Sequence, residues 1–256
     1  MTRYTHPETV ALVLAAGQGK RMRSDLAKVL HPMAGKPLLG HVLDMLEDLG
    51  VSRSVTVIGH QRDMVRAAFP DRRTEWAVQA DQRGTGHAVM CAADALRGFG
   101  GRLLVVCGDT PLLQASTMDE LLEGHAASGA AVTVLSMRLP DPAGYGRVVR
   151  AADGGIDRIV EEKDATEEIR KLDEVNSGIY AFEYPSLERV LSRLTAENSQ
   201  GEYYLTDTVS LLRGDGSKAA VVLAKDYRET LGINTPEQLA EAEAIYRALP
   251  SRRGAA

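Results

Sequence analysis

Residues 10–22 read VALVLAAGQGKRM, and this stretch decides how the rest of the chain is interpreted. Five apolar residues in a row, at positions 10–14, are typical of a strand that is buried on both faces. The small residues and glycines that follow, at positions 15–19, let backbone N–H groups approach a phosphate without an intervening Cβ. The stretch therefore predicts a buried strand that leads into a loop able to bind phosphate.

This loop follows neither of the standard nucleotide-binding patterns. Met22 stands where the G-x-G-x-x-G fingerprint would place its third glycine. A P-loop needs Ser or Thr after Gly-Lys, but Arg21 follows the first Gly-Lys pair and Pro37 follows the second. Residues 17–28 contain four basic residues and only one acidic residue, Asp25, which gives this segment a local charge of +3 in a chain of net charge −5. This basic loop favours a bound polyphosphate, and the alternative is a solvated surface turn.

Outward from the loop, strand-length apolar runs alternate with amphipathic, helix-length stretches, which predicts a parallel α/β sheet. The expected strands are residues 10–14, 55–58, 77–79, 103–106 and 131–137, and the expected helices are 37–49, 61–69, 85–96 and 116–128. After Pro140, short strands at 147–150, 156–160 and 178–182 predict an antiparallel excursion attached to the first layer. Thr235 and Pro236 mark the start of a last helix, which is expected to run to about Leu249.

The overall composition narrows the function classes. The chain has 256 residues, of which 44% are hydrophobic and 25% charged, as in ordinary globular proteins. A net charge of −5 gives no general attraction to nucleic acid or anionic membrane, and no apolar run approaches the roughly 18 residues of a membrane-spanning helix. Cys91 and Cys107 lack the spacing of a disulfide framework or zinc site. We expect a cytoplasmic protein with no nucleic-acid or membrane partner.

A carboxylate follows a second buried strand. Residues 103–111 read LLVVCGDTP, so Asp109 lies just past the carboxyl end of an apolar strand, the edge where open parallel sheets bind ligands. A carboxylate oxygen there suits Mg²⁺, which takes one or two protein carboxylates and completes its shell with water and phosphate. The alternative is that Asp109 caps the helix expected after it. Cys107 is expected to be a buried thiol rather than a nucleophile, since no His is placed as its partner.

Further motifs extend this pattern along the chain. They are KVL at 28–30, QADQRGTGHA at 79–88, GYGR at 144–147, IVEEKDA at 159–165, EVNSGI at 174–179, QGEYYLTD at 200–207 and GIN at 232–234. With the first loop and Asp109, they resemble the sugar-nucleotide pyrophosphorylases, and within these the uridyltransferase domain of bacterial bifunctional N-acetylglucosamine-1-phosphate uridyltransferases. The resemblance covers residues 10 to about 246. It implies a Rossmann-like three-layer α/β nucleotidyltransferase fold with a mostly parallel central sheet and a small antiparallel sugar-binding subregion.

The resemblance also implies an activity, the transfer of a uridylyl group from UTP to N-acetylglucosamine 1-phosphate with Mg²⁺ as cofactor. The products would be UDP-N-acetylglucosamine, a cell-wall precursor, and pyrophosphate. Arg21 and Lys28 would be catalytic by neutralising the phosphates, while Asp109 and Asn234 would hold the metal. The implied substrate-binding residues are Leu14, Ala15, Ala16, Gly17, Gln79, Gly84, Thr85, Asp109, Gly146, Glu161, Asn176 and Asn234. Without the resemblance, the two asparagines would be assigned to turns and Glu161 to the surface.

We expect a single domain over residues 1–256, with a nucleotide-binding part at about 8–139, a sugar-binding part at about 140–234 and a C-terminal helix at about 236–249. We do not expect this domain to contain the hexapeptide repeats of the family's β-helix acetyltransferase domain. The sequence does not decide whether the protein forms a homo-oligomer. Cys107 departs from the polar or aromatic residue expected before Gly108. Two alternatives remain: a pyrophosphorylase for another sugar 1-phosphate or nucleotide, and a catalytically silent module that binds nucleotide sugars.

Overall fold

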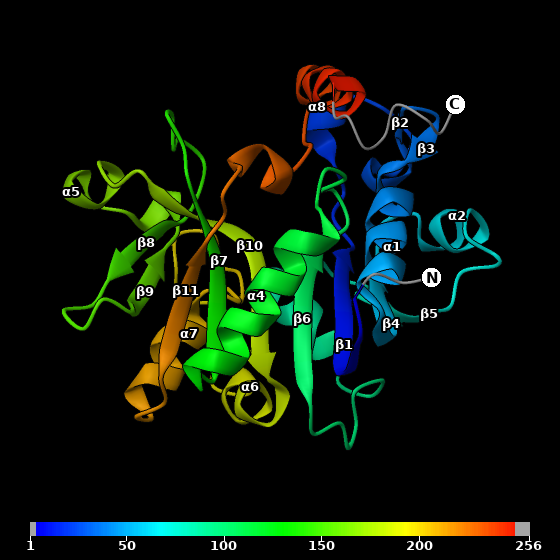
Figure 1. Cartoon of the computed structure of the whole chain (residues 1–256). Helices are drawn as coiled ribbons and strands as arrows, with labels where there is room; N and C mark the ends of the chain where they lie inside the picture. Colours follow the sequence, from blue (N-terminus) through cyan, green and yellow to red (C-terminus); the bar gives the residue numbers. More distant parts are fainter. Residues whose placement is uncertain (1–3, 249–256) are drawn as a thin grey trace.

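The computed structural model describes residues 4–248, and in this range nine strands form one sheet with helices on both faces (Figure 1). Seven strands form the main path of the sheet. In their order across it they are β11 (Ala219–Leu223), β7 (Val132–Arg138), β10 (Glu174–Glu183), β6 (Arg102–Cys107), β1 (His6–Ala15), β4 (Val51–Ile58) and β5 (Thr74–Val78). β1 pairs in parallel with β4 and β6, and β5 pairs in parallel with β4. The predicted parallel α/β core is confirmed.

The antiparallel part of the sheet is built on β10, which runs against both of its neighbours, β6 and β7. β8 (Arg147–Arg150) and β9 (Ile156–Val160) form a hairpin that pairs with β10, and β11 is parallel to β7. A separate small hairpin joins β2 (Pro32–Met33) and β3 (Lys36–Pro37). The result is the predicted fold class, a mostly parallel sheet with a small antiparallel part.

Both faces of the sheet carry apolar side chains, since successive residues of a strand point to opposite sides, and helices bury each face. In β1, Ala11 and Val13 pack into one core cluster, while Val10 and Leu12 pack into the other. The helices that cover the first face are α1 (Leu38–Leu49), α2 (Arg62–Ala67) and α4 (Ala115–Ser128), and those that cover the second are α3 (Thr85–Cys91), α6 (Tyr184–Leu191) and α7 (Asp207–Gly214). These layers confirm the three-layer arrangement.

Shorter helices complete the chain. They are η1 (Lys20–Met22), η2 (Lys28–Leu30), η3 (Glu162–Asp164), α5 (Glu167–Arg170) and η4 (Tyr227–Thr230). The last helix, α8 (Pro236–Ala248), packs next to the β2–β3 hairpin through a cluster that includes Met33 and Ala242 (Figure 1).

The place of β10 corrects the prediction for the second half of the chain. An antiparallel excursion attached to the first layer was predicted, and β10 is antiparallel to its neighbours, but it lies inside the main sheet, between β6 and β7. It also starts at Glu174, four residues before the predicted strand. The physical reason is burial on both faces: Ile179 packs into one core cluster and Phe182 into the other. A strand's own sequence shows this burial but not the identity of its neighbours.

Two helix boundaries carry further information. α3 ends at Cys91, although a helix over 85–96 was predicted, and residues 92–98 form turns. In these turns the carbonyl of Ala95 accepts a hydrogen bond from the Arg53 guanidinium.

α8 begins as predicted, because the Thr235 hydroxyl accepts a hydrogen bond from the backbone N–H of Gln238 at 3.2 Å. The predicted end of this helix at Leu249 lies outside the described residues. No element was predicted for the stretches that form α6, α7 and β11.

Candidate active site

Loops from three parallel strands meet at the carboxyl edge of the sheet. β1 ends at Ala15, β5 at Val78 and β6 at Cys107, and the residues that follow them surround a cavity of about 260 Å³. Nine of the predicted site residues line this cavity: Leu14, Ala15, Ala16, Gly17, Lys28, Gln79, Gly84, Thr85 and Asp109. Arg21, Gly146, Glu161, Asn176 and Asn234 are not among the residues that line it.

A lysine joins the two predicted metal ligands. Lys28 forms an ion pair with Asp109 and donates a hydrogen bond to Oδ1 of Asn234 at 3.1 Å. Asn234, 206 residues away in the chain, is therefore brought to the cavity through Lys28. The side chains of Lys28 and Asp109 are only 13% and 16% exposed, so their charges are poorly screened by solvent. This cluster links η2, the loop after β6 and the segment before α8.

The donor set of this cluster fits Mg²⁺. Asp109 and Asn234 present hard carboxylate and amide oxygens, and both oxygens already converge on one cationic nitrogen. Mg²⁺ commonly takes so few protein ligands because substrate phosphates and water complete its shell. Among residues 4–248 no group of three or more His, Cys, Asp or Glu side chains is placed to hold a metal.

Polar side chains of the glycine loop after β5 form hydrogen bonds within the loop. Gln79 is 4% exposed, and its Nε2 donates to the carbonyl of Gly84 at 3.0 Å and lies 3.1 Å from Nδ1 of His87. The Gln79 amide nitrogen is thus engaged inside the loop, and its Oε1 is the atom left for a ligand. His87, which sequence reasoning did not include in the site, supports Gln79. The available signals were its place in the QADQRGTGHA motif and its position three residues after Gly84.

Gly84 must be glycine for two reasons. Its φ of +102° is unfavourable for residues with a Cβ, and a Cβ placed there would lie 2.6 Å from the carbonyl oxygen of Tyr203. The segment around Tyr203 packs directly on the loop, because the Tyr203 carbonyl also accepts a hydrogen bond from the Gly86 N–H at 2.8 Å. Only a residue without a side chain allows these two backbone segments to meet.

The Gly84→Ala substitution is expected to lower the free energy of unfolding by about 2 kcal/mol more than Gly98→Ala. Gly98 is the matched control, since its φ is +75° but no atom lies within 4 Å of its added Cβ. Urea unfolding of both variants measures the difference, which combines the clash with the strain of the Gly84 backbone, whose ψ is 174°. Equal losses would show that the loop and the Tyr203 segment separate at little cost.

The three residues predicted for the sugar side gather on the antiparallel part of the sheet. The carbonyl of Gly146 accepts a hydrogen bond from the backbone N–H of Asn176 at 2.8 Å, and a Cβ on Gly146 would lie 3.4 Å from Oε2 of Glu161. Oε1 of Glu161 accepts a hydrogen bond from the Thr206 hydroxyl at 3.0 Å. Cys107 connects this group to the cavity, because its Sγ lies 3.7 Å from the carbonyl oxygen of Gly178.

Burial sets the ionisation of two groups here. Burial, followed by the charge of Asp109, raises the pKa of the Cys107 thiol to about 12, so it remains protonated at neutral pH, which argues against a nucleophilic role. Burial also raises the pKa of Glu161, and the hydrogen bond from Thr206 only partly opposes this effect.

The Glu161→Gln substitution is expected to stabilise the protein increasingly as the pH rises. Because the folded-state pKa of Glu161 is raised, its carboxyl supports folding below the ordinary pKa of 4.5, and that support is lost as the pH rises through the folded value. Unfolding midpoints in urea, measured below pH 4.5 and at mildly alkaline pH, test this expectation. Glu167→Gln, at an exposed position, is the control. A pH-independent difference between Glu161→Gln and the unmodified protein would contradict the burial effect.

Arg21 is placed differently from Lys28. It lies exposed in η1 and forms no ion pair with another residue in the range 4–248. Burial and the charge of Asp109 raise the pKa of Tyr145, whereas the charge of Arg21 lowers it. Arg21 and Asp109 therefore both act electrostatically on Tyr145. The loop that carries it passes close to Lys28, because a Cβ on Gly19 would lie 2.6 Å from Cβ of that lysine. Arg21 is thus a free cation beside the Lys28 cluster.

Five residues that line the cavity were absent from the predicted site. They are Val29, Gln82, Ala88, Cys107 and Glu202. Gln82 accepts a hydrogen bond from Gln18 at 3.1 Å across the cavity loops. Glu202 belongs to the QGEYYLTD motif, but its place at the cavity required the folded chain, since it approaches from a segment more than 100 residues away in sequence.

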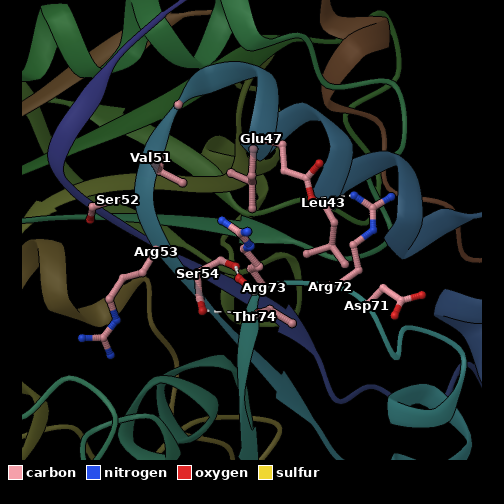
Figure 2. Close-up of a pocket in the computed structure, with 12 residues that line it drawn as sticks. Leu43, Glu47, Val51, Ser52, Arg53, Ser54, Asp71, Arg72, Arg73 and Thr74 are labelled. Carbon is pink, nitrogen blue, oxygen red and sulfur yellow. Dashed lines mark hydrogen bonds and ion pairs between the residues drawn. The ribbon is translucent and has the colours of Figure 1, made fainter. Parts of the chain in front are cut away.

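A larger cavity, of about 450 Å³, lies at the opposite edge of the sheet, where β4 and β5 begin (Figure 2). Its Arg72 is paired with Asp44 and with Glu47, the latter at 2.7 Å, and its Arg53 is paired with Glu75 at 3.0 Å. Figure 2 shows the side chain of Arg53 directed away from that of Glu47. Two of the arginines that line this cavity are therefore neutralised locally, unlike Arg21 at the carboxyl edge.

The sequence of this chain is similar to those of known nucleotidyltransferase proteins. The model of the MobA-like NTP transferase domain matches residues 11–174. The bifunctional protein GlmU of Geobacillus thermodenitrificans is 47% identical over 237 residues, which are 93% of this chain and 51% of that protein. GlmU of Thermobifida fusca is 49% identical over 245 residues, or 93% and 50% of the two chains, and GlmU of Trichlorobacter lovleyi is 49% identical over 240 residues, or 93% and 52%.

The chain spans about half the length of the curated relatives it matches. Within residues 4–248, no helix combines the length and the apolar character that a membrane crossing requires. The family match includes the glycine loop, Lys28, the loop after β5 and Asp109, which are the parts that form the cavity. The resemblance inferred from the motifs is confirmed, and this chain belongs to the MobA-like NTP transferase domain family.

Proposed function

We propose that this chain transfers a uridylyl group from UTP to N-acetylglucosamine 1-phosphate in the cytoplasm, giving UDP-N-acetylglucosamine and pyrophosphate. The observation that carries the proposal is the Lys28 cluster at the carboxyl edge, where Lys28 and Asp109 line the cavity that Cys107 connects to the segment after Asn176. The similarity to proteins named bifunctional protein GlmU over 93% of the chain supports the same activity. The product would serve as a precursor of cell-wall polymers.

Residues 8–139 would hold the nucleotide. The backbone from Leu14 to Gly17 and the glycine loop offer room for a flat base, and Oε1 of Gln79 is an acceptor for a pyrimidine N–H. Lys28 and Arg21 would neutralise the triphosphate, Arg21 being free to move to it from its exposed position. Residues 140–234 would hold the sugar phosphate through Gly146, Glu161 and Asn176, and α8 would support the Asn234 segment.

The reaction needs positioning and charge neutralisation rather than a covalent intermediate. A phosphate oxygen of the sugar 1-phosphate forms a bond to the α-phosphorus of UTP, and the bond from that phosphorus to the β-phosphate oxygen breaks, so pyrophosphate leaves. Lys28, which is paired with Asp109 at the cavity, would offset the charge that gathers on the α-phosphate. Asp109 and Asn234 would hold Mg²⁺, which supplies additional charge neutralisation when bound.

The proposed function is tested by pyrophosphate release from UTP with N-acetylglucosamine 1-phosphate, in the presence and absence of Mg²⁺. Glucose 1-phosphate in place of the amino sugar and dTTP in place of UTP are the comparisons. We expect strong, Mg²⁺-dependent release with the first pair only. Faster release with another pair would reassign the substrate, and no release with any pair would indicate a silent nucleotide-sugar-binding module.

A further inference from the structure

The strand that carries Asn176 is deformed next to the sugar side of the site. In the pairing of β10 with β7, Asn176 is opposite Ser136 and Ile179 is opposite Leu135, so Ser177 and Gly178 form a bulge. Gly178 has a φ of +81°, and the Ser177 hydroxyl donates to the carbonyl of Leu135 at 2.7 Å. A bulge of this kind redirects side chains at functional sites.

The bulge brings together two side chains that a regular strand would separate. Residues four apart in an extended strand are about 13 Å apart. Here Nδ2 of Asn176 donates a hydrogen bond to the hydroxyl of Tyr180 at 2.7 Å. Tyr180 is 2% exposed and its ring stacks on that of Phe182 with centroids 5.5 Å apart, so the hydroxyl is held in place by the core.

A second hydrogen bond fixes which way the Asn176 amide faces. The backbone N–H of Gly178 donates to Oδ1 of Asn176 at 3.0 Å. Since a backbone N–H can only donate, the atom that it meets must be the amide oxygen, and the atom that meets Tyr180 is the nitrogen. The amide is therefore held at both ends.

These two hydrogen bonds leave one donor and one acceptor position of the Asn176 amide available to a ligand. A primary amide has two N–H donors and two acceptor positions on its oxygen. Tyr180 takes one donor and Gly178 takes one acceptor position, so one N–H and one lone pair remain. An acetamido carbonyl can accept from the free N–H, and an acetamido N–H can donate to the free lone pair; because the two point in opposite directions in a trans amide, Asn176 engages one of them. An ammonium group only donates, and a hydroxyl group is shorter than an acetamido group and extends less far from the sugar ring toward Asn176.

We propose that the Tyr180 hydroxyl is a positioning group that holds the Asn176 amide in the orientation that selects an N-acetylated sugar phosphate. The inference rests on the proposed function, and it adds a residue that does not itself contact the substrate. Burial, with the charge of Glu161 nearby, raises the pKa of Tyr180 well above its usual value, so its hydroxyl stays neutral when substrate binds.

The test is the selectivity of Tyr180→Phe, measured as the ratio of kcat/KM for N-acetylglucosamine 1-phosphate to that for glucose 1-phosphate. Without the hydroxyl, one Asn176 N–H lacks its partner and the amide rotates to find another. We expect the ratio to fall about tenfold, through a higher KM for the N-acetylated substrate and an unchanged KM for UTP. The control is Tyr184→Phe, another buried tyrosine, which is the first residue of α6 after the end of β10 and for which no change is expected.

A double substitution separates positioning from a merely structural role. If Tyr180 acts through Asn176, adding Tyr180→Phe to Asn176→Ala should not change the ratio further. An unchanged ratio in Tyr180→Phe, or an equal fall with and without Asn176, would overturn the inference while leaving the proposed function intact. A wild-type protein without any preference for the N-acetylated substrate would contradict the proposed function and this inference together.

A measurement on the unmodified protein keeps the inference testable if a variant fails to fold. In a ¹⁵N NMR spectrum, the two side-chain N–H protons of Asn176 should differ, with one protected from solvent exchange by Tyr180. Equally fast exchange of both protons would contradict the inference.

Discussion

The Lys28→Ala substitution is expected to lower kcat for pyrophosphate release on the order of 10² to 10³ while the protein stays folded. Lys28 is the cation shared by Asp109 and Asn234, and its low exposure makes its charge effective on a phosphate beside it. Steady-state kinetics with UTP and N-acetylglucosamine 1-phosphate measure the effect, and circular dichroism checks the fold.

Lys36→Ala is the matched control for this variant. Lys36 also forms an ion pair with an aspartate, Asp44, but its side chain is 45% exposed and does not line the cavity. Its replacement should leave kcat within about twofold of the unmodified protein, since exposed ion pairs contribute little. Near-normal turnover in Lys28→Ala would remove Lys28 from the proposed chemistry.

The Asp109→Asn substitution is expected to reduce kcat by about 10² or more and to raise the Mg²⁺ concentration needed for half-maximal rate. The change keeps the shape of the side chain and removes its negative charge, so Lys28 loses its ion-pair partner and the proposed metal loses a carboxylate ligand. A Mg²⁺ titration of the initial rate separates this result from a simple loss of folding.

Asp44→Asn provides the comparison for Asp109. Hydrogen bonds and charges from Lys36 and Arg72 outweigh burial, the largest single effect, and lower the pKa of Asp44, so its carboxylate stabilises the fold. Its replacement should reduce stability without altering the Mg²⁺ dependence. If Asp109→Asn showed an unchanged Mg²⁺ requirement, Asp109 would not be a ligand.

The sequence was sufficient to predict the parts of the fold that local patterns encode. The apolar run of β1 and the loop after it identified the carboxyl edge, and Asp109 was located there from the strand before it. The start of α8 was predicted from Thr235 and Pro236 because a helix start depends only on neighbouring residues. Such features depend on a few residues close together in the chain.

The remaining features depend on contacts that no local pattern contains. The insertion of β10 between β6 and β7 follows from packing on both of its faces. The link from Lys28 to Asn234 spans 206 residues, and the approach of Glu202 to the cavity depends on a segment that no predicted element covered. The motifs suggested that these residues share a site, but their mutual orientation required the folded chain.

A crystal structure of the protein with UDP-N-acetylglucosamine would show directly whether the carboxyl edge binds the nucleotide sugar. We expect the uracil in the cavity lined by Leu14, Gln79 and Gly84, and the acetamido group against Asn176, with the two phosphates beside Lys28. Product bound in the larger cavity at the opposite edge of the sheet, or a sugar turned away from Asn176, would contradict this expectation.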